Sequence, residues 1–197
     1  VDSINIENGV SKGIILENGD KIYSDFVISS AGVQNTLNRF LRNEKQLITY
    51  RNKLDLIKPS FGHACLYVGF DQSAKELGIS NTNLWIYPSY NHDLNTQNFM
   101  KDENSEFPVT YISFPSSKDP TWDNEHPGTA TLEAIVPTSF NSVEKWKDKP
   151  WKKRGNEYIE YKEKFTQRII SKIYEINPNL KNKISFAELS SPLSTRD

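Results

Sequence analysis

Four short segments of this chain alternate between two kinds of side chain, and this period of two constrains the fold more than any other feature. The segments are residues 61–70, 83–89, 107–114 and 129–138. Successive side chains of a strand point to opposite faces of a sheet, so each segment predicts a strand with two unlike faces. One face is aliphatic and carries Ala64, Leu66, Val68, Phe70, Leu84, Ile86, Ile112, Phe114, Ala130, Leu132, Ala134 and Val136. The other face carries Phe61, His63, Cys65, Tyr67, Trp85, Tyr87, Val109, Tyr111, Thr131, Glu133 and Ile135.

The two faces predict two environments. The aliphatic face requires helices over it. The ring-rich face is typical of a sheet that covers a hydrophobic cavity, although a sandwich core would have the same composition. We expect four of its rings to line a slot for an apolar ligand, together with a fifth ring from the loop 115–128. These residues are Tyr67, Trp85, Tyr87, Tyr111 and Trp122.

Helices and connections are predicted around these strands. Residues 156–176 place apolar side chains at three- and four-residue spacing, which is typical of an amphipathic helix, and Asn177-Pro178 ends it. A short helix is expected over 34–48, a connector over 52–59 and an aperiodic polar loop over 90–106. Asp71 is expected to cap a short helix that Gly78 ends. A last strand is expected over 184–189.

The first 32 residues have the pattern of a meander followed by a buried strand. Asn8-Gly9 and Asn18-Gly19 are hairpin signals between strands expected at 1–7, 12–17 and 20–24. Residues 25–32, DFVISSAG, form a short continuous apolar run that ends in small residues. Such a run is typical of a strand buried on both faces.

Several kinds of chemistry have no sequence signal in the chain. The nine glycines are never two positions apart, so the dinucleotide fingerprint G-x-G-x-x-G does not occur. The three histidines are scattered, so we expect no metal site. A net charge of −1 gives no general attraction to nucleic acid. Cys65 is the single cysteine, so no internal disulfide forms, which fits a reducing compartment. No apolar run reaches the roughly 18 residues of a membrane helix.

Two side chains on the ring-rich face are candidate catalytic groups. His63 would polarise a substrate hydroxyl or relay a proton, and the alternative is a core histidine bonded to a neighbour. Glu133 would donate a proton if it faced the cavity, because desolvation raises the pKa of a carboxyl group. If Glu133 faces solvent, it has no such role.

The segment Lys145 to Arg154, KWKDKPWKKR, contains six positive charges and one negative charge, a net of +5. It is interpreted either as a solvated loop or as a patch that contacts a membrane surface peripherally. Nucleic-acid binding is disfavoured because the rest of the chain is neutral or acidic. The residues of the membrane interpretation are Trp146, Lys147, Trp151, Lys152, Lys153 and Arg154.

Several motifs resemble one family of flavoproteins. The sequence FPSSKDPTWDNEHPG at 114–128, KKRG at 152–155, Gly155-x-x-Tyr158 and Ser191-Pro192-Leu193-Ser194 resemble the retinol saturase branch of the FAD-dependent carotenoid desaturases and isomerases. The resemblance implies an FAD cofactor, with NAD(P)H as a possible electron donor, and a hydrophobic polyene substrate such as retinol or a carotenoid. It implies hydride transfer between the flavin and a substrate carbon. It also places Val1, Ser30 and Ala31 as flavin contacts, and it assigns no catalytic residue.

Together these observations predict an α/β (α+β) fold. Residues 1–33 are expected to belong to an FAD-binding domain, as a meander and a returning strand. Residues 34–197 are expected to form a substrate-binding domain, with a mixed or antiparallel sheet and helices on one face. The chain starts at Val1 within a strand pattern, so we expect it to be an internal part of a longer, cytoplasmic or membrane-associated polypeptide.

The predicted function is to bind the substrate of an FAD-dependent oxidoreductase that acts on conjugated isoprenoids. The alternatives are a flavin-free isoprenoid-binding module and a structural interaction domain. We expect the chain alone to be inactive and to purify colourless, because it lacks the segments that bind the flavin phosphates. A yellow preparation with a flavin spectrum would refute this expectation.

Overall fold

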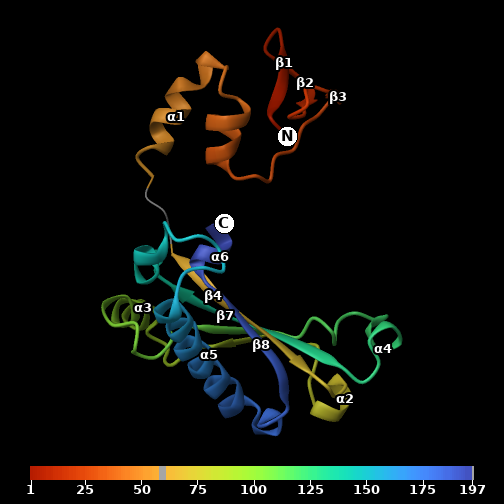
Figure 1. Ribbon diagram of the computed structural model, residues 1–197, viewed down its shortest axis with the longest axis vertical. Coiled ribbons are helices and arrows are strands. Elements are labelled where there is room, and N and C mark those ends of the chain that lie inside the picture. The colour runs from red at the N-terminus through yellow and green to blue at the C-terminus, as the bar shows by residue number, and fades with distance from the viewer. Residues whose placement is uncertain (58–60, 197) are drawn as a thin grey trace. The chain divides into compact units, whose positions relative to one another are not determined.

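The computed structural model describes residues 1–57 and 61–196 (Figure 1). The chain divides into two compact units, and the boundary between them in the sequence lies between residues 60 and 61. The segment 34–57, which sequence analysis groups with the larger part, therefore lies in the first unit. The roles of the two units in binding cofactor and substrate stay predictions. The expected α/β class is confirmed, because both units combine helices with antiparallel strands.

The first unit begins with the predicted meander. Its strands are β1 Ser3–Glu7, β2 Val10–Ile15 and β3 Lys21–Tyr23, and each pairs antiparallel with the next. Asn8 and Gly9 adopt the positive φ values of 52° and 78° that a tight hairpin requires. Gly13 has a φ of 130°, and a Cβ there would lie 1.9 Å from the carbonyl oxygen of Ile22. Glycine at this position is therefore what allows β2 and β3 to pair.

The strand expected over residues 25–32 is absent, and this prediction is wrong. No part of that segment is a strand, and the side chains of Phe26 and Ile28 are 85% and 95% exposed. An apolar run becomes a strand only when neighbouring strands take its backbone hydrogen bonds, and among the described residues no strand pairs with it.

The helical part of the first unit is broken into three pieces. A π-helix Asn35–Phe40 (η1), a 3-10 turn Lys45–Leu47 (η2) and α1 Ile48–Leu54 replace the single helix expected over 34–48. The connector expected from residue 52 begins after α1, and its residues 58–60 lie outside the described residues. Arg42 ties η1 to β1 through an ion pair with Asp2 at 2.6 Å.

The second unit contains one five-stranded antiparallel sheet of order β5-β6-β7-β4-β8. Its strands are β4 Gly62–Phe70, β5 Leu84–Ile86, β6 Thr110–Ser113, β7 Ala130–Thr138 and β8 Ile184–Ser190. The five predicted strands are thus confirmed, with shorter bounds for β5 and β6. Within the described part of this unit there is a single sheet, so its core is helix on sheet and not a sandwich.

Helices and turns connect these strands. They are α2 Ala74–Leu77, α3 His92–Lys101, α4 Trp122–Glu125, η3 Phe140–Ser142, η4 Glu144–Trp146, α5 Asn156–Ile176, η5 Pro178–Leu180 and α6 Pro192–Arg196. The long helix α5 has the predicted bounds. The loop expected over 90–106 is wrong, because α3 occupies 92–101 with Asn91 as its N-cap. Gly78 ends α2 as predicted, but its cap is Ser73, which forms a capping box with Glu76, and not Asp71.

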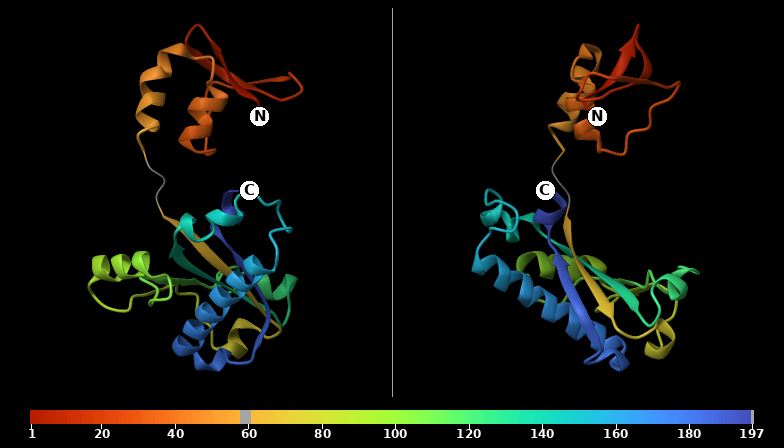
Figure 2. Two further views of the ribbon diagram at one scale, coloured as in Figure 1. Left: turned by 60° about the vertical axis from the view of Figure 1, so that its left-hand side comes forward. Right: turned by 45° about the vertical axis from the view of Figure 1, so that its right-hand side comes forward.

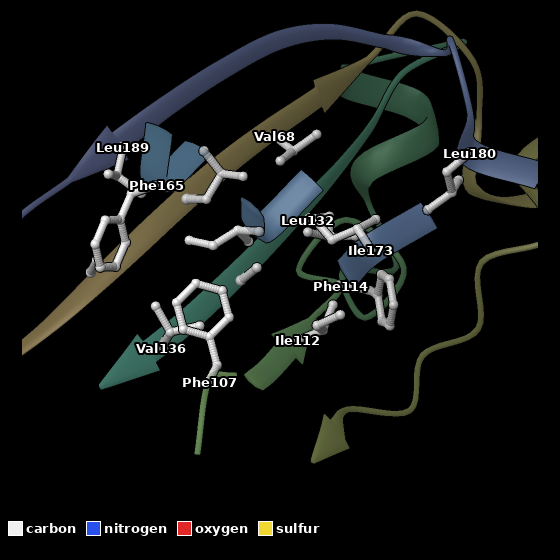
Figure 3. Packing of buried hydrophobic residues seen from close by; sticks show 14 of the residues in the cluster. Val68, Phe107, Ile112, Phe114, Leu132, Val136, Phe165, Ile173, Leu180 and Leu189 are labelled. Atoms are coloured by element: carbon white, nitrogen blue, oxygen red, sulfur yellow. The ribbon is translucent and has the colours of Figure 1, made fainter. Parts of the chain in front are cut away.

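The core lies between the aliphatic face of the sheet and α5 (Figures 2 and 3). Leu66, Ala134 and Val136 of the sheet and Ile169 of α5 are completely buried. Phe99 of α3 joins the same cluster through Phe107, with ring centroids 5.8 Å apart. The aliphatic side chains of the alternating pattern therefore face the helices, as expected. The ring-rich side chains lie on the opposite side of the sheet.

A smaller cluster fixes the segment that follows β7. It consists of Val143, Trp146, Tyr158 and Leu193, and the Tyr158 and Ser191 hydroxyls lie 2.6 Å apart within it. Trp146 is 2% exposed and Arg154 is 4% exposed. Trp146 therefore does not belong to a surface patch, which corrects its expected place in the basic segment. The ring of Trp146 packs against the ring of Tyr158.

Candidate functional site

The side of the five-stranded sheet opposite α5 presents two adjacent rows of side chains, which we call the open face. Strand register places Trp85, Tyr111, Ile135, Cys65 and Ser190 in one row across β5, β6, β7, β4 and β8. The next row contains Ser113, Glu133, Tyr67 and Glu188. Paired residues of neighbouring strands lie on the same face, so all of these side chains share one surface. The alternation in sequence thus becomes a continuous strip across the sheet.

Large rings of the open face remain accessible. Trp85 is 63% exposed and Tyr67 is 44% exposed, whereas the residues beside them in the strands are buried or half-buried. The rings of Trp85 and Tyr111 are tilted against each other with centroids 4.7 Å apart. Asn83 donates a hydrogen bond of 2.8 Å to the Tyr111 hydroxyl, which fixes that ring. Exposed rings on one face of a soluble domain mark a binding surface more often than isolated ones do.

The centre of the open face contains three groups that can exchange protons. Burial raises the pKa of the Cys65 thiol, and interaction with that thiol raises the pKa of the Tyr67 hydroxyl. Both groups are therefore neutral at physiological pH. Glu133 lies opposite Tyr67 in the register and is half-buried. The arrangement offers hydrogen bonds to a ligand but contains no activated nucleophile.

The two candidate catalytic residues lie on the open face but do not form a pair. His63 is opposite Pro137 in the β4–β7 register, and Glu133 is opposite Tyr67. The two sites are thus four residues apart along the strands, or roughly 13 Å at about 3.3 Å per residue. His63 is exposed, so the alternative of a core histidine is wrong. A concerted acid-base role for the two residues does not follow from this geometry.

A small cavity lies where the open face meets α3. Its volume is about 160 Å³, and it is largely apolar. The ring of Tyr87 forms its wall together with His92, with centroids 4.4 Å apart in an edge-on contact. The lining residues are Phe61, Tyr87, His92, Thr96, Phe99, Met100, Pro108, Val109 and Pro137. A cavity of this size accommodates about one six-membered ring.

Trp122 occupies a different position from the other predicted rings. It begins α4, and its Nε1 donates a 3.2 Å hydrogen bond to the carbonyl oxygen of Thr129. Its ring lies 4.4 Å from that of His126. The ring thus folds onto its own loop, whereas the sequence predicted that it lines the slot. Trp122 is not among the residues that line the cavity beside α3.

The predicted flavin contacts belong to the first unit. Val1, Ser30 and Ala31 are exposed, and Ser30 and Ala31 lie in the segment that lacks strand partners. Among the positive-φ residues of the meander, Asn8, Gly9 and Gly19 occupy hairpin turns and Gly13 lies within β2, so none is in a turn that leads into a helix. Among residues 1–57, nothing forms the glycine-rich cradle that a dinucleotide phosphate requires. The described residues of the first unit therefore do not by themselves form a site for the phosphates of FAD.

Sequence reasoning missed several parts of the surface. Met100 and His92, which line the cavity, come from α3. This helix was not predicted because the segment 90–106 is mainly polar. Phe186 and Glu188 come from β8, whose position beside β4 is a long-range pairing. The strand itself was predicted, and its sequence contained a signal for these two side chains. Phe186 and Glu188 alternate with Ala187 and Leu189, and of these four residues only Leu189 is buried.

Over residues 1–57 and 61–196, no group of three or more His, Cys, Asp or Glu side chains is placed to hold a metal ion. None of the helices in the described part of the chain has the length and apolar character to cross a membrane.

Comparison with known proteins identifies relatives over nearly the whole chain. It is 32% identical to the all-trans-retinol 13,14-reductase of Rattus norvegicus and 29% identical to that of Homo sapiens, each over 95% of the chain. It is 30% identical to an inactive all-trans-retinol 13,14-reductase of Danio rerio over 92% of the chain. The chain spans about a third of the length of these relatives. No family model matches it. The resemblance to the retinol saturase branch is thereby confirmed.

Proposed function

We propose that this chain, a homologue of the all-trans-retinol 13,14-reductases, supplies the isoprenoid-binding surface of an FAD-dependent oxidoreductase. The open face of the second unit would be the floor on which a conjugated chain lies. The reaction of the whole protein would reduce, desaturate or isomerise a polyene. The observation that carries the proposal is the row of Trp85, Tyr111, Ile135 and Cys65, with Tyr67 beside it, on the side of the sheet opposite α5.

The shape of this surface suits a rod-like apolar ligand. Adjacent strands lie about 4.8 Å apart, so a row across four strands extends over roughly 15 Å. A flat polyene laid along the row would contact ring faces at the Trp85 end and the aliphatic Ile135 near the middle. Burying the exposed ring surface provides affinity without requiring many hydrogen bonds. The surface thus selects for length and flatness.

The cavity beside α3 would bind one end of the ligand. Its volume of about 160 Å³ accommodates a ring or a branched terminus but not a second ring. Tyr87 and Val109, which line it, directly adjoin the ends of β5 and β6 and lie two residues from Trp85 and from Tyr111, respectively. The terminal ring of the ligand and its polyene chain would then bind to one continuous surface.

The flavin would be bound mainly by residues outside this chain. When bound, FAD supplies the hydride-transfer chemistry of the reaction. The chain's own residues would orient the polyene and exclude water from it. The first unit would belong to the FAD-binding domain, as the resemblance implies.

A flavin-free isoprenoid-binding module is the second candidate function. It is favoured by one observation: one of the relatives carries the name of an inactive reductase. Both candidates require the open face to bind an isoprenoid. A G-x-G-x-x-G segment in the coding sequence upstream of Val1 would distinguish the first from the second.

Retinol titration of two variants and a control tests the proposal. Trp85→Ala and Tyr111→Ala remove ring surface from the floor, so each is expected to weaken binding of all-trans-retinol by about tenfold or more. Tyr50→Ala removes a similarly exposed ring of α1 in the first unit, outside the five-stranded sheet, and is expected to bind like the parent. The dissociation constant is measured from retinol fluorescence. Unchanged affinity in both floor variants, or no saturable binding, would contradict the proposal.

A further inference from the structure

A second and larger cavity lies beside β8, at the edge of the sheet that is remote from β5. Its volume is about 550 Å³. It lies between β8, the segment 151–155 and the first turns of α5. Its lining residues are Tyr67, Trp151, Lys152, Arg154, Gly155, Tyr158, Ile159, Lys162, Glu188, Leu189, Ser190 and Ser194.

The charges of this cavity are mainly positive. Among the residues that the structure describes, the charged groups that line it are Lys152, Arg154, Lys162 and Glu188. The guanidinium of Arg154 is buried over the ring of Tyr158, 5.3 Å from its centroid. Burial lowers the pKa of Lys162, and the nearby Glu188 opposes this effect. Partly desolvated cations of this kind gain most from an anionic partner that enters between them.

The rim of the cavity is apolar as well as basic. Trp151 is 64% exposed and Ile159 is 63% exposed. The ammonium group of Lys152 lies 4.5 Å from the centre of the Trp151 ring. Lys149 and Lys153 are also exposed on the same segment. A ligand confined to the cavity would leave the side chains of Trp151 and Ile159 in water, whereas a lipid surface would cover them.

We propose that this edge of the second unit binds an anionic lipid bilayer, with a phosphate-bearing headgroup in the cavity and with Trp151 and Ile159 at the level of the headgroups. Lysine attracts anionic lipid, and tryptophan prefers the boundary between headgroups and acyl chains. Buried Trp146 takes no part, so the contact is narrower than the basic segment as a whole. The cavity shares Tyr67, Glu188 and Ser190 with the open face, but the vesicle contact requires no isoprenoid on that face.

Vesicle co-sedimentation of the whole chain tests this binding. The probe is a vesicle of phosphatidylcholine with about one third phosphatidylserine, compared with pure phosphatidylcholine. We expect the chain to bind the anionic vesicle only, and less as salt is added. Lys152→Gln combined with Lys162→Gln should reduce the binding constant by about fivefold for each lysine. Trp151→Ser should also reduce it and should remove the blue shift of tryptophan emission on binding.

Matched substitutions elsewhere serve as controls. Lys75→Gln with Lys101→Gln removes two exposed lysines of α2 and α3, and Trp85→Ser removes an exposed ring of the open face. Both should bind vesicles like the parent, and circular dichroism should show every variant folded. Three results would overturn the proposal: absent or equal binding to both vesicles, loss of binding in the controls but not in the cavity variants, or binding of soluble glycerophosphoserine or an oligonucleotide without binding of vesicles.

Discussion

Tyr161 of α5 lies among polar groups that close one end of the core of the second unit. There a side-chain oxygen of Glu103 accepts hydrogen bonds from Thr138 at 2.5 Å and from Ser142 at 2.6 Å. Burial and the charge of Glu103 raise the pKa of the Tyr161 hydroxyl well above its usual value. A single side chain thus couples the stability of this unit to alkaline pH.

The direction of this coupling follows from proton binding. Above the ordinary tyrosine pKa of about 10, the unfolded chain loses the Tyr161 proton while the folded chain keeps it. The free energy of unfolding is therefore expected to fall as pH rises above about 10, by at most roughly 1.4 kcal/mol per pH unit for this residue. Urea unfolding at a series of pH values, followed by tryptophan fluorescence, measures the slope.

Two variants isolate the contribution of Tyr161. Tyr161→Phe should flatten the alkaline slope, although Cys65 and Tyr67, whose pKa values are also raised, leave part of it. Tyr90→Phe changes a fully exposed tyrosine and should leave the slope unchanged. Equal slopes in the parent and in Tyr161→Phe would show that this hydroxyl does not carry the effect.

At the scale of elements, α5 holds the sheet through one stripe of side chains. Ile169 is completely buried against the sheet, while Ile159 on the same helix is mostly exposed. Ile169→Ala leaves a cavity in the core and should lower the free energy of unfolding by about 2–5 kcal/mol. Ile159→Ala keeps a good helix former at a surface position and should change it by less than about 0.5 kcal/mol. Urea denaturation compares the two, and similar losses would contradict this account of the stripe.

Elements with a strong period were predictable from sequence, and those without one were not. The apolar spacing of α5 and the Asn177-Pro178 stop gave its bounds, and alternation gave β4 and β7. The helix α3 escaped prediction because Phe99 is its only buried residue, so it has no apolar stripe. The run at 25–32 was assigned to a strand from composition, but a strand also needs partners, and composition cannot supply them.

At the scale of the whole chain, the candidate site depends on register as well as on alternation. Alternation placed Tyr67, Trp85 and Tyr111 on one kind of face, and the register then brought Trp85 and Tyr111 into contact. It set Tyr67 two strands away from Tyr111, with β7 between them. Trp122 was assigned to the same surface from its place in a loop, where no period specifies a direction. The strand pairing that builds the open face is therefore the part that sequence alone left undetermined.

Photolabelling with a diazirine analogue of retinol measures most directly whether the open face binds a polyene. Peptide mass spectrometry of the labelled chain should find adducts on β4, β5, β6 and β7 at open-face positions such as Tyr67, Trp85 and Tyr111. Excess all-trans-retinol should displace them. Adducts confined to the outer surface of α5 or to the first unit, or labelling that retinol does not displace, would contradict the proposed binding surface.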